Sequence, residues 1–93
     1  MIRYWLEFNF ENYALIPFGT RMGCGVTAFN YEDALNIVKN KVFNDNPIAP
    51  IKRTVENIDI STLDAGHVLL NMGMPSVRGI WFPLGYNLFR KRN

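Results

Sequence analysis

Apolar and polar residues alternate along the first ten positions of the chain. The apolar set shares one parity and consists of Ile2, Tyr4, Leu6, Phe8 and Phe10. The other parity is mostly polar and consists of Arg3, Trp5, Glu7 and Asn9. Because successive side chains of a strand point to opposite faces, this alternation predicts a half-buried antiparallel strand over residues 2–10. We expect this strand to anchor the hydrophobic face of a sheet.

A second strand and a helix are predicted to meet at Asn30. Residues 24–29 are rich in β-prone side chains. Asn30 is a favourable N-cap residue, and Asp33 stands three positions later, where its carboxylate can reach back toward the helix start. An apolar stripe at helical spacing then runs over residues 31–43, through Tyr31, Leu35, Val38 and Val42. The stripe predicts a helix that covers one face of a sheet and ends before Pro47.

The second half of the chain has a less regular pattern. Residues 51–60 suit a third strand, but its apolar residues change parity, and a β-bulge near Glu56 and Asn57 would restore the alternation. Residues 61–66 carry the signature of a capping box closed by glycine, which predicts a single helical turn. The segment that follows shows no period and is predicted to be a loop, until residues 80–82 suit a short last strand.

The order strand–strand–helix–strand–strand predicts an α+β fold. We expect a two-layer domain over residues 1–93, in which one main helix packs on one face of a sheet of three or four mostly antiparallel strands. A ferredoxin-like plait would need a second full helix, and residues 61–66 offer only one turn. Residues 11–22 are predicted to connect the first two strands, since Pro17 and Gly19 interrupt any regular element.

Composition agrees with one small domain and adds a basic end. The chain has 93 residues, of which 48% are hydrophobic, and its net charge is +2. Three of the ten basic residues lie in the C-terminal tail, residues 90–93, which leaves seven basic and eight acidic residues in the body. Such a tail attracts a polyanion weakly and in a salt-sensitive way. We expect no membrane span, and the single cysteine, Cys24, favours a cytoplasmic, reducing location.

His67 is the candidate for acid–base chemistry. It is the only histidine and follows Asp64 by three positions, so the carboxylate could orient the imidazole while Arg78 holds an anionic substrate. A lone histidine beside a capped turn is more often a structural hydrogen-bonding residue. Because no second histidine or cysteine lies near it, we predict no metal site and no cofactor. The glycine-rich segment 19–25 opens into a strand, so it does not fit a phosphate-binding loop.

Aromatic residues and an arginine crowd the irregular segment 72–86. Trp81, Tyr86 and Arg78 belong to the residue types enriched at the centres of protein interfaces. Trp5 can join them if its strand lies alongside. The predicted binding residues are Arg78, Trp81, Tyr86, Trp5 and His67. The alternative is a loop folded back to complete the core, which suits Ile80, Phe82 and Leu84.

These features favour a small non-catalytic interaction module that binds a protein partner or a second copy of itself. A single-stranded nucleic-acid binder, using the aromatic residues and the basic tail, is an alternative of another class. The weak charge of the body argues against it. A small enzyme that uses His67 and Asp64 is the third possibility.

Two groups of sequence strings add a resemblance. Residues 25–28 (GVTA) before 32–35 (EDAL), and residues 71–73 (NMG) before 78–86 (RGIWFPLGY), resemble segments of small uncharacterised bacterial proteins. The resemblance covers most of the chain. It implies a compact intracellular bacterial domain, and it transfers no activity and no catalytic residue.

Overall fold

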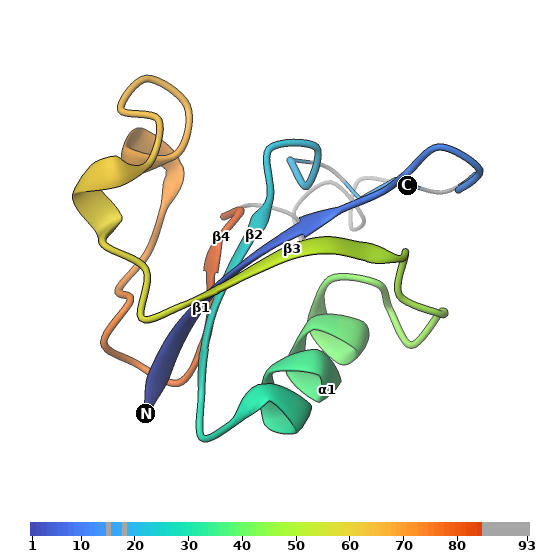
Figure 1. The fold of residues 1–93 in the computed structure, drawn as a ribbon, viewed down its shortest axis with the longest axis horizontal. Coiled ribbons are helices and arrows are strands. Elements are labelled where there is room, and N and C mark those ends of the chain that lie inside the picture. The colour runs from blue at the N-terminus through green and yellow to red at the C-terminus, as the bar shows by residue number, and fades with distance from the viewer. Residues whose placement is uncertain (15, 18, 85–93) are drawn as a thin grey trace.

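A computed structural model describes residues 1–14, 16–17 and 19–84 of the chain. In chain order, its strands and α-helix are β1 (Ile2–Phe8), β2 (Cys24–Ala28), α1 (Tyr31–Lys41), β3 (Ile51–Glu56) and β4 (Gly79–Phe82) (Figure 1). The strands lie side by side in the order β3-β1-β2-β4, and each neighbouring pair is antiparallel. The predicted α+β class with one main helix is confirmed, and so is the order of the elements.

The helix begins as its sequence predicts. The Asn30 side-chain oxygen accepts a hydrogen bond from the Asp33 N–H at 2.8 Å, and the Asp33 carboxylate accepts one from the Phe29 N–H at 3.0 Å. Two donors at the helix start are therefore satisfied by side chains. The helix ends at Lys41 rather than at residue 43. Asn44 and Asp45 have positive φ angles, which these short polar residues tolerate and which stop the helix.

The sheet face beneath α1 carries one core. The apolar parity of β1 is buried there, as predicted, together with Val26 of β2 and the inner face of α1 (Figure 1). The fully buried side chains of this core include Leu6, Val26, Ala34, Val38 and Val42. We call it the helix-side core.

The opposite face of the sheet carries a second core. Residues 57–78, coloured yellow to orange in Figure 1, fold over it as an irregular cover. The buried residues of this second core come from both the sheet and the cover, and we call them the loop-side core: Trp5, Ile58, Val68, Trp81 and Phe82. Trp5 therefore does not share the exposure of its polar neighbours in β1, which corrects the expectation of an open second face. Both faces of the sheet are therefore covered. An α-helix covers one face, and the irregular segment with its 3-10 turns covers the other.

Strand β3 is shorter than predicted. It ends at Glu56, where Asn57 takes up a left-handed conformation with φ 53° and turns the chain away from the sheet. The ladder with β1 shifts register between Glu7 and Phe8, where Lys52 is the extra residue. The predicted bulge near Glu56 and Asn57 is thus wrong, because the strand ends there and the irregularity lies at its other end.

The cover contains two short 3-10 turns, Ile60–Thr62 and Leu69–Asn71. Asp59 caps the first turn, since its carboxylate accepts from the Ser61 N–H at 3.0 Å and from the Ser61 hydroxyl at 2.8 Å. The single turn predicted over residues 61–66 therefore starts one residue earlier and ends sooner. The Ser61 hydroxyl, at the start of the predicted capping box, donates a hydrogen bond to Asp59 instead of accepting one from a backbone N–H.

Candidate functional site

Both tryptophans lie in the loop-side core. Trp5 is 3% exposed and Trp81 is 1% exposed. Their rings stack with centroids 6.0 Å apart, and the Trp5 ring is 5.7 Å from that of Phe82. The strands do bring Trp5 and Trp81 together, but in the interior. The expectation that they form an exposed contact surface is wrong on this point, because the irregular cover buries them.

Two glycines of the 19–25 segment make room for these indoles. A Cβ atom on Gly25 would lie 2.5 Å from the Trp81 ring, and one on Gly23 would lie 2.3 Å from the Trp5 ring. Both distances are far below van der Waals contact, so a side chain at either position would displace an indole. Glycine within or beside a strand often marks such a close approach, and this signal in the sequence could have located the aromatic core.

The two indole N–H groups differ in their surroundings. Trp5 Nε1 donates to Glu7 Oε2 at 3.0 Å, and the same oxygen is 3.1 Å from Arg53 Nη1. Trp81 Nε1 is buried and has no acceptor among the residues that the structure describes. A buried unsatisfied donor destabilises a fold by about 1–3 kcal/mol. The stacking and burial of Trp81 must offset that cost.

Arg78 lies on the surface, where its side chain already has a partner within the chain. Its guanidinium binds both carboxylate oxygens of Asp33, with Nε 2.9 Å from Oδ2, and it lies 5.1 Å above the Phe29 ring. The hydrogen bond from Arg78 and that from the Phe29 N–H hold the pKa of Asp33 below its ordinary value. Asp33 in turn raises the pKa of Arg78. One carboxylate thus closes the helix cap and ties the segment before β4 to it.

Four exposed apolar residues belong to the segments that meet at the end of the sheet where this ion pair lies. The pairs Ile2–Ala28 and Thr27–Gly79 bring together the residues just before β1, just after β2 and just before β4. A hydrogen bond from the Thr27 hydroxyl to the Pro75 carbonyl holds the turn before β4 against β2. We call the four exposed apolar residues there the sheet-end patch: Met1 at 64% exposure, Phe29 at 65%, Met74 at 68% and Val77 at 60%.

His67 and Asp64 meet in an exposed turn of the cover. His67 Nδ1 is 3.2 Å from Asp64 Oδ1, and the His67 side chain is 74% exposed. The same oxygen accepts from the backbone N–H groups of His67 and Gly66, and the hydrogen bonds from His67 and Gly66 lower the pKa of Asp64. Arg78 binds Asp33 rather than this pair. The contacts of Asp64 therefore hold a turn, with no substrate clamp assembled beside it from Arg78.

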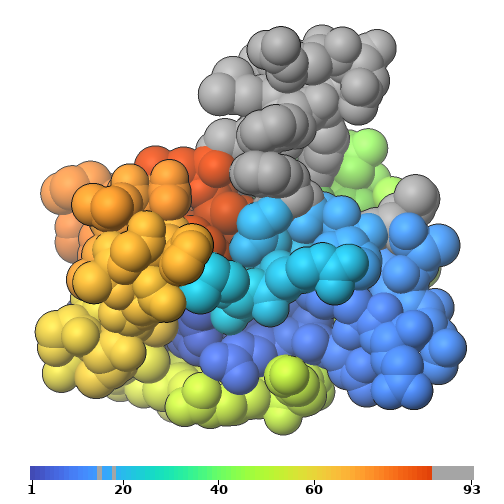
Figure 2. Space-filling model, turned by 90° about the horizontal axis from the view of Figure 1, so that it is seen from above, coloured from blue at the N-terminus to red at the C-terminus, as the bar shows by residue number. Residues whose placement is uncertain are grey.

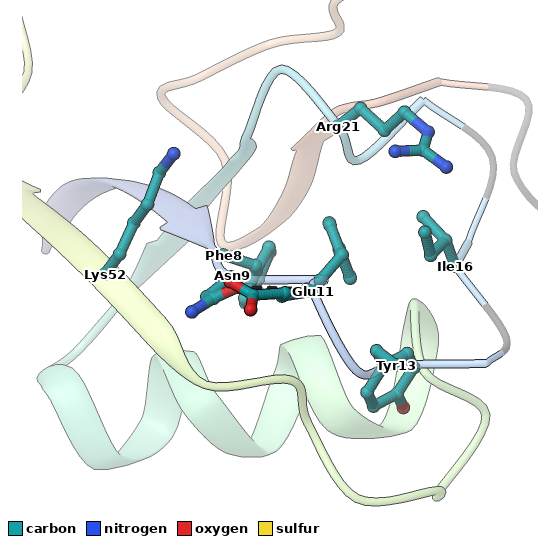
Figure 3. A pocket seen from close by; sticks show the side chains of 8 residues that line it. Phe8, Asn9, Glu11, Tyr13, Ile16, Arg21 and Lys52 are labelled. Atoms are coloured by element: carbon teal, nitrogen blue, oxygen red, sulfur yellow. Dashed lines mark hydrogen bonds between the residues drawn. The ribbon is translucent and has the colours of Figure 1, made fainter.

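A cleft lies beyond the end of β1. Its volume is 740 Å³, and its lining includes Phe10, Glu11, Tyr13, Arg21 and Lys52. In Figure 2 the segment before β2 (cyan) lies between the residues that follow β1 (blue) and the cover (yellow to orange). Figure 3 shows Lys52 projecting from β3 on one side and Arg21 from the segment before β2 on the other. Residues 11–22 were predicted only as a connection, and nothing in their pattern indicated a cleft.

Thiol and metal chemistry have little support in the described part of the chain. Cys24 is fully buried, and burial raises the pKa of its thiol to about 12, so the nucleophilic thiolate is not formed near neutral pH. Among the described residues, no three side chains of His, Cys, Asp or Glu are grouped closely enough to hold a metal ion. None of the helices described there has the length and apolar character needed to cross a membrane.

Tyr86 and the basic tail, residues 90–93, fall outside the described residues, so the predictions made for them stay predictions. The resemblance to small bacterial proteins also stays a prediction. Searches of protein families, of curated proteins and of solved structures found no match to this chain.

Proposed function

We propose that this protein is a non-catalytic interaction module that associates with a second copy of itself through the sheet-end patch. The distribution of exposed apolar side chains carries the proposal. Within the described residues, five large apolar side chains are at least 60% exposed, and four of them form this patch. Singly scattered apolar residues are normal on a protein surface, whereas clustered ones are typical of interaction sites.

The charges beside the patch suit a contact between identical surfaces. In a two-fold symmetric dimer the same patch faces itself, so an unpaired charge near the axis would meet its own copy. Arg78 and Asp33 neutralise each other within one chain. The Arg78 guanidinium also covers one face of the Phe29 ring, which leaves the patch apolar and free of net charge from this pair.

The edges of the sheet favour association through side chains rather than through strand pairing. The outer edge of β4 is covered by the segment 71–73, since Gly73 N–H donates to the Trp81 carbonyl at 2.7 Å and Leu84 N–H to the Asn71 carbonyl at 3.3 Å. The outer edge strand on the other side, β3, carries exposed charged residues, which oppose edge-to-edge pairing.

A concentration series in sedimentation velocity tests the proposal. Phe29→Ser and Val77→Ser should each raise the dimer dissociation constant at least about tenfold, which corresponds to about 1.4 kcal/mol of binding. Leu70→Ser is the matched control, because Leu70 is 79% exposed and belongs to the 3-10 turn Leu69–Asn71 rather than to the patch. Urea unfolding of each variant checks that the fold is retained.

Two results would overturn the proposal. One is a wild-type protein that sediments as a monomer up to about 1 mM, a concentration that reveals even weak self-association. The other is a dimer that Leu70→Ser weakens as strongly as Phe29→Ser does. The nucleic-acid alternative has less support than the sequence alone indicated, since the burial of Trp5 and Trp81 leaves neither ring exposed for stacking on a base.

A further inference from the structure

The cleft beyond the end of β1 has the size of a small-molecule site. Its 740 Å³ falls within the range of about 300–1,000 Å³ that is usual for ligand pockets. Its lining comes from three parts of the chain: residues 8–11 and 13 at and after β1, Ile16 and Arg21 before β2, and Lys52 on β3 (Figure 3). It lies away from the sheet-end patch, since it adjoins the C-terminal end of β1 and the patch adjoins the N-terminal end.

Aromatic contacts fix the apolar wall of the cleft. The Phe10 ring lies 5.5 Å from that of Phe8 and 5.9 Å from that of Tyr13. Tyr13 also packs edge-on against Phe43 of the helix-side core, with centroids 5.7 Å apart, and its hydroxyl donates to the Pro47 carbonyl. A wall tied to the core in this way needs little ordering when a ligand binds, and such preorganisation favours affinity.

The charged groups of the cleft are mainly basic. Arg21 and Lys52 approach it from opposite sides (Figure 3), and neither side chain forms an ion pair or a hydrogen bond with another described residue. Glu11 is the acidic residue of the lining. Two cations and one anion leave a formal excess of one positive charge at neutral pH, which one carboxylate group balances.

We infer that this cleft binds a small organic monocarboxylate with an aromatic or branched apolar body. The Arg21 guanidinium offers the carboxylate two parallel N–H donors, and Lys52, on the opposite side of the cleft, adds positive charge without contacting it (Figure 3). The apolar body packs against Phe10, Tyr13 and Ile16, which are partly buried and lack a full covering of protein atoms. A phosphate would use the same cations, but it would leave the apolar wall in contact with water.

Titrations of the full chain with model compounds, followed by the amide shifts in two-dimensional NMR, test this assignment. Phenylacetate is the probe. Acetate and inorganic phosphate lack its ring, and phenylacetamide lacks its charge. Phenylacetate should shift amides of residues 9–13 and of Lys52, and it should bind at least about tenfold more tightly than each of the other three compounds.

Charge-removing variants assign the site to its residues. Arg21→Gln should weaken phenylacetate binding about fivefold to tenfold, because it loses a charge-assisted contact, and Lys52→Gln should weaken it about twofold, because it loses only a longer-range attraction. Lys39→Gln is the control, since Lys39 is exposed on α1 and does not line the cleft. Amide spectra of the free variants verify that each remains folded.

Several outcomes would overturn the inference. If phosphate binds as tightly as phenylacetate, the cleft recognises charge alone. If phenylacetamide binds as tightly, the cleft recognises the apolar ring and the two cations have no role. Phenylacetate that causes no shifts in the cleft, or whose affinity is unchanged in both Arg21→Gln and Lys52→Gln, would remove the site altogether.

Discussion

The apolar side chains on the two faces of the sheet are buried in different ways. On one face, the apolar side of α1 packs against the apolar side chains of β1 and β2. Medium-sized side chains such as Leu6, Val26 and Val38 fill the space between the helix and the sheet. On the other face, no α-helix lies among the described residues. Two stacked tryptophans occupy the face, and an irregular segment with two 3-10 turns closes over them.

This difference shows what an irregular cover requires. A helix presents a row of side chains at a constant spacing, so it can cover a face with small and medium residues. A loop cannot supply such a row, and large rings from the sheet fill the volume instead. Room for the rings then comes from positions that have no side chain, Gly23 and Gly25. The glycines and the tryptophans are therefore one packing unit, although they are distant in sequence.

The largest expected effect tests whether the loop-side core stabilises the fold as much as the helix-side core does. Trp81→Ala should reduce the free energy of unfolding by about 3–5 kcal/mol, and Leu6→Ala by about 2–5 kcal/mol, because both side chains are fully buried. Urea unfolding measures both. A loss below about 1 kcal/mol for Trp81→Ala would mean that the cover opens without affecting the rest of the molecule.

A second effect, of intermediate size, tests the packing of indole on glycine. Gly25→Ala should destabilise the protein by about 1–3 kcal/mol, because the new methyl group overlaps the Trp81 ring. Gly66→Ala is the control, since the nearest atom to its Cβ would be 3.5 Å away. In a Trp81→Ala background the penalty of Gly25→Ala should disappear. An equal penalty in both backgrounds would contradict the proposed unit.

The helix side has a smaller and more local test. Asn30→Ala should destabilise the protein by about 1 kcal/mol, because the Asp33 N–H loses its side-chain acceptor. Thermal or urea unfolding measures the change. Asn36→Ala serves as a control at an exposed helix position. If the two variants have the same midpoint, the cap contributes nothing to the stability of the helix.

The smallest effect concerns the acid stability that Arg78 and Asp33 provide. The pKa of Asp33 in the folded protein is below its ordinary value of 3.8, chiefly because Arg78 donates hydrogen bonds to it. Between these two pKa values the unfolded chain binds more protons, so stability falls as the pH is lowered through this window. Arg78→Gln should therefore reduce the loss of unfolding free energy between pH 5 and pH 2. Denaturant unfolding at a series of pH values measures this loss in both proteins. An identical acid profile in both proteins would show that the pair does not couple to folding.

Sequence reasoning succeeded where neighbouring residues carry the information. The alternation in β1, the cap at Asn30 and the helical stripe each depend on contacts between residues at fixed, short spacings. It was less successful in residues 51–79. The end of β3 depends on the backbone conformation of Asn57, and the cap of the first 3-10 turn depends on which of two neighbouring polar side chains acts as acceptor.

The candidate sites were predicted less well than the fold. Arg78 is exposed and its predicted binding role stays a prediction, while its partner Asp33 was assigned only to the helix cap. The aromatic residue exposed beside Arg78 is Phe29 rather than Trp81. The cleft was missed because its lining comes from three separate segments, none of which has a distinctive pattern alone.

The amino-acid sequence by itself determined the element order, the α+β class and the burial of the apolar parity of β1, since these follow from periodicity and from capping over short distances. Only the tertiary structure decided that Trp5 and Trp81 are interior and that Phe29 is exposed. The physical reason is that a residue type records how much surface a side chain can bury, and not which distant segment will cover it. Covering Trp5 requires β1, β2, β4 and residues 57–78 to be in place together.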